Sequence, residues 1–515
     1  MRTPRHQLWD ELLRLPDQPA LPLQARLRSA VVREILAGRL VSGAALPSSR
    51  DLARLLGLSR NTVTSAYQQL VDEGYLQSRP RSGNFVADGA RPSMALPTAP
   101  TPSSGAAAAG TQPPDWSSRV LRSLSGRPTL SKPERWRDDY RYAFVYGHHD
   151  PQLFPTEDFR ECCARSLARA QLAQWAPDFE TEDVPELIEQ IRLRLLPKRG
   201  VFALPEEIIV TVGAQQAFHM LAEALLDRST RVGFEEPGYP HARTAFALRE
   251  PHWVPLPVDG DGLTIDRAFA AGAQPPDYVF VTPSRQSPTT VSLSLARRRA
   301  LLQRAQADDF VIIEDDYESE NLHEGTPMPA LKSMDRSGRV IYVGSLSKSL
   351  SPAVRLGYIV APRALVAELR VLRHAIVRHP SAFLQHAYAL FLSLGHHESH
   401  ARRVNQAMRE RLHLAAEALR QHLPDFRFTL PQGGASIWVR APAWVDAADL
   451  ALTARRHGVL IEAGDVFFAK PPYPCPFFRL RLSSIAPTLI EPGLRALAGA
   501  VDELGAARGA RRGSL

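Results

Sequence analysis

Residues 344–358 read GSLSKSLSPAVRLGY, and this stretch decides how the larger part of the chain is interpreted. It begins at the end of the apolar run RVIYV, which predicts a buried strand. Lys348 lies just beyond that strand among small hydroxyl residues, and Arg355 follows seven residues later. A lysine that forms a Schiff base needs a buried, preorganised position near an aldehyde, and a hydroxyl with an arginine suits a phosphate. Taken alone, the stretch could equally be a basic loop.

A second motif lies upstream, where VIIEDDY spans residues 311–317. It puts Asp315 at the carboxyl end of a predicted buried strand, and ligands of open α/β sheets gather at such ends. A carboxylate there can pair with a protonated pyridine nitrogen, and Tyr317 can hydrogen-bond a ring hydroxyl. The same acidic strand end is also compatible with a magnesium site.

Two further motifs suit a phosphorylated aromatic ring. In TVGAQQAF (211–218) a predicted strand ends and a helix begins at Gly213, Ala214 and Gln215, so free N–H groups and the helix dipole would cradle a phosphate. In EEPGYP (235–240) Tyr239 could stack on a flat ring. Each motif is weak alone, but together they are spaced for one cofactor.

Apolar runs alternate with helical patterns over residues 135–505. Continuous apolar runs between amphipathic helices predict a mostly parallel sheet covered on both faces, so we expect an α/β fold there. The composition is that of a globular chain, since 44% of the residues are hydrophobic and 23% are charged. No uninterrupted apolar run reaches the ~20 residues that a membrane span needs, so no membrane partner is expected.

The first part of the chain has a different pattern. Residues 23–37 have helical periodicity, and residues 46–76 predict two more helices around a sharp turn. Ser48 or Ser49 suits the N-cap of the first of these, and Gly57 suits the turn. Ser59 suits the N-cap of the second. The segment YLQSRPRSGNFVAD (75–88) then predicts a two-stranded wing.

The helix after Ser59 has one polar face. It carries Arg60, Asn61 and Thr64, which are side chains suited to base edges and phosphates. The net charge of the chain is +8, and residues 1–88 supply half of it with 12 Arg against 8 Asp and Glu. A generic helical hairpin with a solvated face is the alternative. The caps, the turn, the polar face and the basic wing together favour a DNA-binding domain.

The same residues resemble a known family. Residues 21–88, and PSSRDLARLLGLSRNTV within them, are similar to the winged helix-turn-helix of GntR-type regulators. The resemblance implies that the recognition helix and the wing contact operator DNA. The residues it points to are Arg50, Ser59, Arg60, Asn61, Thr62, Thr64, Arg81 and Gly83.

Residues 140–505 resemble fold type I aminotransferases, which use pyridoxal 5′-phosphate (PLP). The whole chain resembles the MocR-type branch of GntR regulators, in which a winged helix is tethered to an aminotransferase-like domain. The shared motifs are GAQQA, EEPGYP, TPSRQSPT, IEDDY, GSLSKSLSPAVRLGY and RLRLSSI. The resemblance implies an α/β fold: a winged helix-turn-helix, a large lobe with a mostly parallel seven-stranded sheet, and a smaller C-terminal α+β lobe.

The resemblance also implies the role of each cofactor contact. Lys348 would form the Schiff base with PLP and be the catalytic residue. Asp315 would face the pyridine nitrogen, Tyr317 the ring oxygen, and Tyr239 would stack on the ring. The phosphate would be held by Gly213, Ala214, Gln215, Ser345 and Arg355.

Effector contacts follow from the same resemblance. Arg479, in FFRLRLSSI, matches the family arginine that pairs with an amino-acid carboxylate. The alternative is a surface arginine at a strand end, because Arg481 offers a competing register.

Several positions depart from the family pattern. Arg285 stands where family members often carry His, Thr290 where aminotransferases usually have Gly, and Ser287 where they have a ring-contacting Asn. Residues 172–196 also lack the usual glycine turn. These changes surround the substrate, so we expect tuning to an effector or weakened turnover, with Arg285 as a second effector contact.

The expected organisation has five parts. They are a winged helix-turn-helix (1–88), a linker rich in Pro, Ala and Ser (89–134), a PLP-binding large lobe with an N-terminal arm (135–385), a small lobe (386–505) and a basic tail (506–515).

We therefore expect a PLP-dependent transcriptional regulator that binds operator DNA and senses a small amine or amino acid, or PLP itself, by aldimine exchange at Lys348. The alternative is an active PLP-dependent aminotransferase with an accessory DNA-binding domain. A regulator is favoured over an enzyme, although partial transaminase chemistry is compatible with the motifs. Family resemblance further implies a homodimer with crossed domains.

No metal is expected. His396 and His400 are one helical turn apart, but no third ligand is evident and a solvated helix face is favoured. Three cysteines cannot build a disulfide framework, which favours the cytoplasm.

Overall fold

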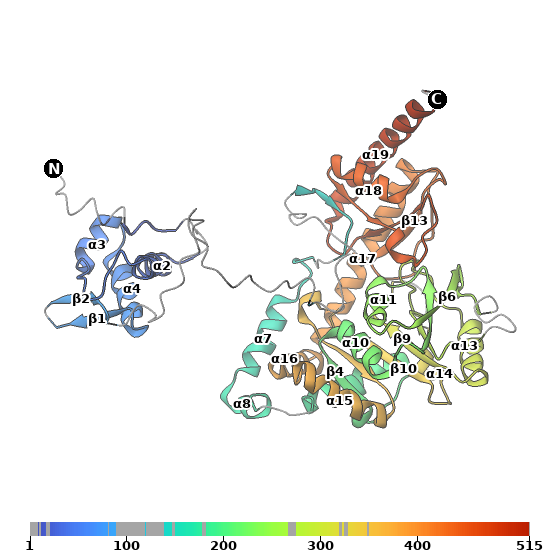
Figure 1. Cartoon of the computed structure of the whole chain (residues 1–515), viewed down its shortest axis with the longest axis horizontal. Coiled ribbons are helices and arrows are strands. Elements are labelled where there is room, and N and C mark those ends of the chain that lie inside the picture. Colours follow the sequence, from blue (N-terminus) through green and yellow to red (C-terminus); the bar gives the residue numbers. More distant parts are fainter. Residues whose placement is uncertain are drawn as a thin grey trace, which may run out of the picture. The chain divides into compact units, whose positions relative to one another are not determined.

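The structure is a computed structural model of the chain (Figure 1). It describes residues 9, 12–16, 21–80, 82–88, 119, 139–146, 150–177, 182–265, 274–318, 322–323, 328–347 and 350–513, with 509–513 described by backbone alone. Contacts divide the chain into two compact units, Met1–Val120 and Leu121–Leu515. The described residues include no helix that is both long and apolar enough to cross a membrane.

The first unit is a winged helix-turn-helix, as expected. It contains α2 (Leu23–Leu36), α3 (Ser49–Leu56), α4 (Arg60–Asp72) and the antiparallel strands β1 (Leu76–Arg79) and β2 (Gly83–Val86). Ser48 caps α3 by accepting a hydrogen bond from the N–H of Asp51, and Ser59 caps α4 in the same way from Thr62. Gly57, with a φ of 64°, ends α3 in the left-handed region that favours glycine.

The core of the first unit follows the helical periodicity, with one addition. Leu27, Val31, Leu52 and Val63 are fully buried, as the apolar stripes predict. Glu34 is also buried on α2, where apolar periodicity gives no reason for a carboxylate. Its side chain pairs with Arg39 and Arg33, and the hydrogen bond from Arg39 holds the pKa of Glu34 below its ordinary value despite the burial.

The second unit is built on a large mixed sheet, which is mostly parallel (Figure 1). Strands β10, β9, β8, β5 and β6 pair in parallel, and only β11 and β7 run the other way. In sheet order the strands are β4 (Ile208–Thr211), β11 (Gly357–Val360), β10 (Val340–Ser345), β9 (Val311–Asp316), β8 (Tyr278–Val281), β5 (Arg231–Glu236), β6 (His252–Asp259) and β7 (Gly262–Leu263).

The sheet has eight strands rather than the seven expected. The addition is β7, two residues that fold back on the edge strand β6 through the turn at Gly260. So short a pairing has no apolar run of its own, and for that reason the sequence pattern does not reveal it. The α/β class and the predominance of parallel pairing are confirmed.

Helices cover both faces of this sheet, because successive residues of each strand point to opposite sides. On β9, Ile313 packs with residues of α10 (Gly213–Leu225), α11 (Pro240–Ala247) and α15 (Arg363–Val377). Ile312, one residue away, packs on the other face with α13 (Leu295–Ala307) and α14 (Leu331–Met334).

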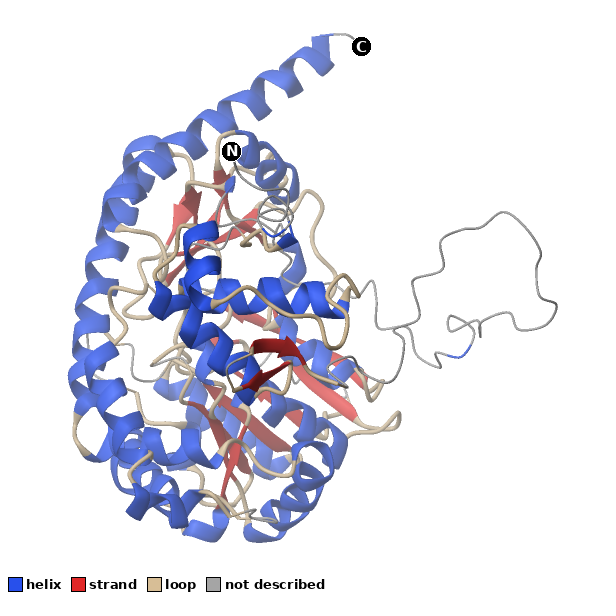
Figure 2. Cartoon of the chain, turned by 90° about the vertical axis from the view of Figure 1, so that its left-hand side faces the viewer, coloured by secondary structure: helices blue, strands red, loops and turns tan. Residues whose placement is uncertain are grey.

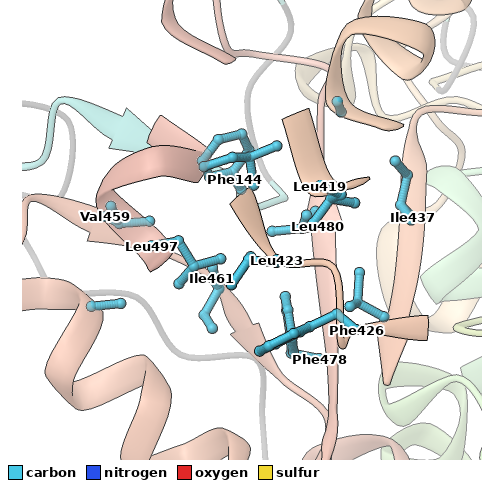
Figure 3. Packing of buried hydrophobic residues seen from close by; sticks show 14 of the residues in the cluster. Phe144, Leu419, Leu423, Phe426, Ile437, Val459, Ile461, Phe478, Leu480 and Leu497 are labelled. Carbon is cyan, nitrogen blue, oxygen red and sulfur yellow. The ribbon is translucent and has the colours of Figure 1, made fainter. Parts of the chain in front are cut away.

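The small lobe has its own sheet and core. Strands β12 (Arg427–Phe428), β13 (Ser436–Arg440), β16 (Phe477–Arg481) and β15 (Glu462–Ala463) form an antiparallel sheet, packed against helices α17 (His396–His422), α18 (Ala447–Arg456) and α19 (Pro487–Gly513). Figure 3 shows Phe144 packed among these apolar side chains. Phe144 follows β3 (Tyr142–Ala143), which pairs with β14 (Val459–Leu460), so the N-terminal arm is part of this lobe. The end of α19 extends beyond the lobe (Figure 2).

The remaining elements surround the large sheet. Helix α16 (Ala382–Ser393) buries Tyr388 and Phe391 in the large-lobe core, which favours a boundary between the lobes later than the expected residue 386. The others are α7 (Thr156–Ser166), α8 (Arg169–Trp175), α9 (Pro185–Gln190), the π-helical η1 (Ile191–Leu195), and the 3-10 turns η2 (Leu196–Arg199), η3 (Pro205–Glu207), η4 (Pro352–Val354) and η5 (Asp465–Phe467).

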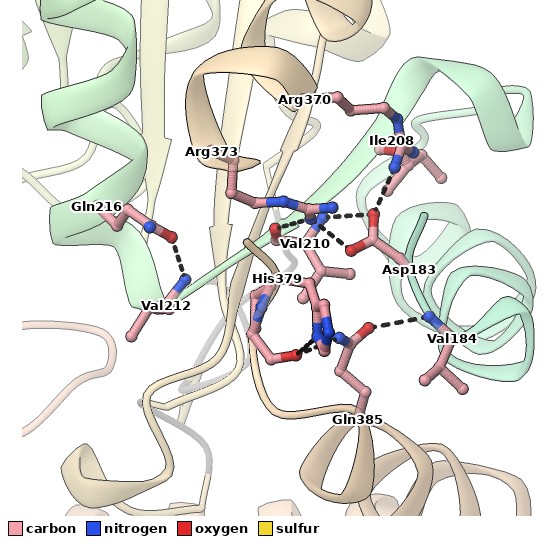
Figure 4. A network of polar contacts seen from close by, with 11 residues as sticks. Asp183, Val184, Ile208, Val210, Val212, Gln216, Arg370, Arg373, His379 and Gln385 are labelled. Atoms are coloured by element: carbon pink, nitrogen blue, oxygen red, sulfur yellow. Dashed lines mark hydrogen bonds and ion pairs between the residues drawn. The ribbon is translucent and has the colours of Figure 1, made fainter. Parts of the chain in front are cut away.

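Strand β4 lies at the edge of the sheet, and polar side chains form hydrogen bonds with its backbone groups. Asp183 accepts a hydrogen bond from the N–H of Val210 at 3.2 Å and pairs with both Arg370 and Arg373 (Figure 4). The same arginines donate to the carbonyl oxygens of Ile208 (2.8 Å) and Val210 (2.6 Å). These contacts provide hydrogen-bond partners for backbone groups at the edge of the sheet, and they hold the strand that leads into α10 in place.

Other buried arginines also bind backbone carbonyl oxygens. Arg298, fully buried, donates to Pro283 at 2.7 Å, to Leu293 at 2.9 Å and to Pro329 at 2.8 Å. Arg411 does the same for Leu482 at 3.2 Å. Inside this fold, arginine thus links neighbouring loops by donating hydrogen bonds to their carbonyl oxygens.

Candidate functional site

One cavity in the second unit gathers most of the residues expected to hold a cofactor. It lies at the carboxyl ends of the parallel strands, between the large and the small lobe. The residues lining it are Tyr146, Ala214, Gln215, Phe218, Tyr239, His241, Ser287, Asp315, Tyr317, Ser345, Ser347, Pro352, Arg355, Arg479 and Arg481.

The start of α10 forms one end of the cavity. No side chain caps this helix, so the first N–H groups, at Gly213 to Gln215, point out of its positive end. Gly213 has a φ of +70°, and a Cβ there would lie 3.1 Å from the guanidinium carbon of Arg355. Arg355 also donates to the carbonyl oxygen of Val212 at 3.1 Å. A helix start and an arginine side by side make an anion site.

Ser347 anchors the chain next to Lys348. Its hydroxyl oxygen accepts from the N–H of Leu356 and donates to the carbonyl oxygen of Leu356, both at 3.0 Å. Lys348 itself lies outside the described residues. Ser345, at the end of β10, lines the cavity two residues before this anchor.

The acidic run on β9 splits between the two faces of the sheet. Asp315 is 2% exposed and lines the cavity. Asp316 points the other way and binds Arg199 at 2.7 Å and the Tyr342 hydroxyl at 2.8 Å. Burial opposes its ionisation, but Arg199 and these hydrogen bonds hold the pKa of Asp316 below its ordinary value. The structure thus assigns the two carboxylates different surroundings, which their adjacency in the sequence does not reveal.

Two tyrosines line the cavity near Asp315. Tyr239, the residue before α11, meets Phe218 edge to face at a centroid distance of 6.4 Å. Burial raises the pKa of Tyr239 and of Tyr317 well above the ordinary value, and the charge of Glu318 raises that of Tyr317 further. Both phenols are therefore protonated donors at neutral pH.

Arg479 lines the cavity as expected, but it already has a carboxylate partner. Its Nε donates to Glu462 of β15 at 2.6 Å, and both side chains are buried. The other oxygen of Glu462 accepts from the N–H of Tyr146 at 2.7 Å. The guanidinium also lies over the Phe467 ring, 4.7 Å from its centroid. Glu462 thereby orients Arg479 and offsets its charge.

Arg481 reaches the same cavity, because alternate residues of β16 share a face. The two registers are therefore not exclusive, and the alternation alone could have indicated this. Arg481 pairs with Glu318 at 2.8 Å and donates to the Ser436 hydroxyl at 3.0 Å. Arg285 lies 3.4 Å from the other oxygen of Glu318, and it is not among the described residues that line the cavity.

The loop of residues 282–290, which departs from the aminotransferase pattern, is held in place by a buried glutamate. Glu235 accepts from the Thr282 hydroxyl at 2.6 Å and from the Gln286 amide at 3.2 Å. Gln286 also donates to the carbonyl oxygen of Pro237 at 2.8 Å, which ties the Tyr239 loop to the Ser287 loop. Burial raises the pKa of Glu235 to about 7. The sequence carries no signal for this network beyond the polar residues themselves.

On the first unit, the predicted DNA contacts lie at one end of α3 and α4. Arg50, Arg60, Asn61 and Thr64 are exposed, as is Gly83 of the wing. The hydroxyls of Ser59 and Thr62 are 2.8 Å apart and belong to the cap of α4. Arg81 lies outside the described residues.

The HHESH segment and the three cysteines lie in the described part of the chain. The described residues contain no group of three His, Cys, Asp or Glu side chains that could hold a metal ion. The expectation of a solvated helix face is wrong for His400, which is fully buried with its ring 6.4 Å from that of Phe391.

Family models match both units of the chain. The model of bacterial regulatory proteins of the gntR family covers residues 23–86, and that of aminotransferases of class I and II covers residues 179–497.

Known proteins resemble the chain over most of its length. It is 41% identical to the HTH-type transcriptional regulator TauR of Rhodobacter capsulatus, over 93% of this chain and 96% of the relative. It is 34% identical to the probable rhizopine catabolism regulatory protein MocR of Rhizobium meliloti, over 79% of each. A solved structure, the α-aminoadipate aminotransferase LysN of Thermus thermophilus with N-(5′-phosphopyridoxyl)-L-leucine bound, is 28% identical and has a TM-score of 0.69, covering 76% of this chain and 99% of that one.

The two units and these relatives define a class: HTH-type transcriptional regulators with an aminotransferase-like domain. This chain belongs to the MocR-type branch of the GntR regulators. The reading as a regulator is therefore supported over that of an aminotransferase with an accessory DNA-binding domain.

Proposed function

We propose that this regulator binds PLP in the cavity of its second unit and responds there to a small amine that carries an acidic group. The observation that supports this most is the convergence, in one cavity, of the uncapped start of α10, Arg355 and the buried Asp315. These groups suit a phosphate at one end and a pyridinium nitrogen at the other.

The residues fit the group chemically. The N–H groups of Gly213, Ala214 and Gln215 with Ser345 and Arg355 would hold the phosphate, and the missing Cβ of Gly213 leaves room for the Arg355 guanidinium. Asp315 would face the ring nitrogen, Tyr317 would donate to the ring oxygen, and Tyr239 would lie against the ring. When bound, PLP supplies an aldehyde that condenses with amines.

Lys348 is the amine that we propose holds this aldehyde. The Ser347 anchor fixes the backbone beside it, and the strand that precedes it ends at the cavity. An amine effector would take the place of the lysine, while an arginine of β16, Arg479 or Arg481, orients its acidic group. The position of the cavity between the lobes would limit the access of water to a bound cofactor.

An absorbance experiment tests this proposal. Purified protein with PLP should absorb in the near-ultraviolet and visible range in a way that free PLP does not, and Lys348→Ala should lose that band while still folding. The control is Lys332→Ala, whose ammonium group donates to the carbonyl oxygen of Val340 at 2.7 Å and lies outside the cavity. An unchanged band in Lys348→Ala refutes the assignment.

We propose that α4 reads operator DNA with Arg60, Asn61 and Thr64, while Arg50, Ser59, Thr62, Arg81 and Gly83 contact the backbone or shape the cap. Arg60→Ala should weaken specific operator binding by at least about tenfold, as expected for a lost base or phosphate contact, and leave PLP binding unchanged. Footprinting that is unaffected by the substitution would reject the recognition-helix assignment.

A cytoplasmic homodimer, with crossed DNA-binding domains, would bring two winged helices to paired half-sites. Light scattering of the purified protein should then give twice the 57.0 kDa of one chain. A monomer that binds a palindromic operator with full affinity would count against the dimer.

A further inference from the structure

Three buried side chains form a charge cluster that reaches the cavity through Arg481. Glu318 lies between Arg481 at 2.8 Å and Arg285 at 3.4 Å. The side chains are 1%, 9% and 6% exposed, respectively, so water screens them little. Two guanidinium groups share one carboxylate, which leaves the cluster with a net charge of +1.

The neighbouring pair is balanced instead. Arg479 and Glu462 lie 2.6 Å apart, and each contributes one charge. An anion that approaches Arg481 therefore meets a cluster with a surplus positive charge, whereas one that approaches Arg479 meets a balanced pair. Because both arginines line the cavity on one face of β16, the difference lies in their partners and not in their access.

Glu318 is also held in place by shape. Gly434, with a φ of +77°, has no Cβ, and one there would lie 2.5 Å from a carboxylate oxygen of Glu318 and 2.8 Å from the Cδ of Arg285. The backbone next to Gly434 is fixed as well, since its carbonyl oxygen lies 2.7 Å from the Nε2 of His323. The small lobe thus packs directly over the charge cluster.

We propose that Glu318 and Arg285, neither of which is a described residue of the cavity wall, set the affinity of Arg481 for the acidic group of the effector. This deepens the proposed function and rests on it. Glu318 offsets part of the charge of Arg481 and so weakens the binding of an anion, whereas Arg285 restores it. Both are positioning residues, because they would act on the acidic group of the effector through Arg481.

The proposal predicts opposite effects for two neutral substitutions. Glu318→Gln removes the competing negative charge, so acid-bearing amines should bind about tenfold more tightly or better. Arg285→Gln removes the compensating positive charge, so the same amines should bind about tenfold more weakly. The double variant keeps the net charge of +1 and should return to the wild-type affinity within about threefold.

The measurement is calorimetric titration of the full-length, PLP-loaded protein. The probes are aminoalkanoates with one to four methylene groups and 2-aminoethanesulfonate, each compared with the n-alkylamine of the same length. The quantity of interest is the affinity for the acid-bearing amine divided by the affinity for the alkylamine, because a general loss of packing would lower both affinities alike. Comparing the sulfonate with the carboxylates shows which of the two acidic groups binds more tightly.

Glu34→Gln is the matched control, since it also neutralises a buried glutamate between two arginines, Arg33 and Arg39, but belongs to the first unit and is not among the described residues that line the cavity. Its ratio should equal that of the wild type. Equal ratios in Glu318→Gln, Arg285→Gln and the wild type overturn the inference. If Glu318→Gln does not fold, the loss in Arg285→Gln decides alone. Failure of every amine to bind wild-type protein rejects the proposed function instead.

Discussion

At the scale of single residues, Gly213 combines a conformational and a steric requirement. Gly213→Ala should raise the Kd for PLP at least about tenfold, because its Cβ would push against Arg355, one of the groups proposed to hold the phosphate. The positive φ at this position also costs alanine about 1–3 kcal/mol in the folded protein, with or without PLP. Absorbance titration measures the Kd. Gly338→Ala is the matched control, since its φ is +73° and nothing lies within 4 Å of its Cβ. If both variants bind PLP equally, the contact with Arg355 is unimportant.

Glu235 makes stability depend on pH. Its pKa is raised from 4.5 to about 7 in the folded protein, mainly by burial, so its stabilising contribution is complete below pH 4.5 and is lost as the pH rises through about 7. Glu235→Gln has no proton to lose and can still accept from Thr282. Relative to the wild type, its free energy of unfolding should rise by about 2–3 kcal/mol between pH 5 and pH 8.

Urea denaturation at the two pH values measures this difference. A constant gap between Glu235→Gln and the wild type would show that the carboxyl stays ionised throughout the range.

Residues with a chemical signature were predictable from the sequence, and their partners were not. Asp315, Tyr239 and Arg355 come from local motifs, and the structure brings them to one cavity. Glu318 and Glu462 have no motif, because each takes its meaning from an arginine more than ten residues away that only the folded sheet brings near. Arg479 and Arg481 are not competing registers, because alternate residues of β16 share one face and both line the cavity.

At the scale of elements, the edge strand β4 depends on Asp183. Asp183→Ala should lower the free energy of unfolding by about 3–5 kcal/mol, because it leaves the fully buried Arg373 without its counter-ion. Glu157→Ala is the control, because the pair that Glu157 forms with Arg160 is exposed and worth about 1 kcal/mol or less. Chemical denaturation compares the two. Similar losses would mean that the edge network is not a buried ion pair in solution.

Elements were easier to predict where a pattern is long. The helices around Ser59 and the strands that flank Lys348 have clear periodicity, whereas β7 has two residues and no pattern. Helix α16 is apolar on most sides, so the sequence alone does not indicate which lobe it joins.

At the scale of the whole molecule, the two units have separate hydrophobic cores. We therefore expect two unfolding transitions in calorimetry, of which PLP raises only the one that belongs to residues 121–515. At 100 times its Kd, PLP should stabilise that unit by about 2.7 kcal/mol. The DNA-binding unit should keep its midpoint. A single transition that shifts as a whole would indicate that the units unfold together.

The use of arginine for hydrogen bonds to buried backbone groups has a chemical consequence. Among the 62 basic residues of the chain, lysines occur only at positions 132, 198, 332, 348 and 470. Guanidinium groups stay protonated and do not condense with aldehydes as amines do. If the cavity holds PLP as proposed, most cations of the fold are groups that this carbonyl compound cannot modify. The guanidinium groups of Arg298, Arg373 and Arg411 donate hydrogen bonds inside the fold as lysine could. Unlike lysine, they would not form Schiff bases with an aldehyde.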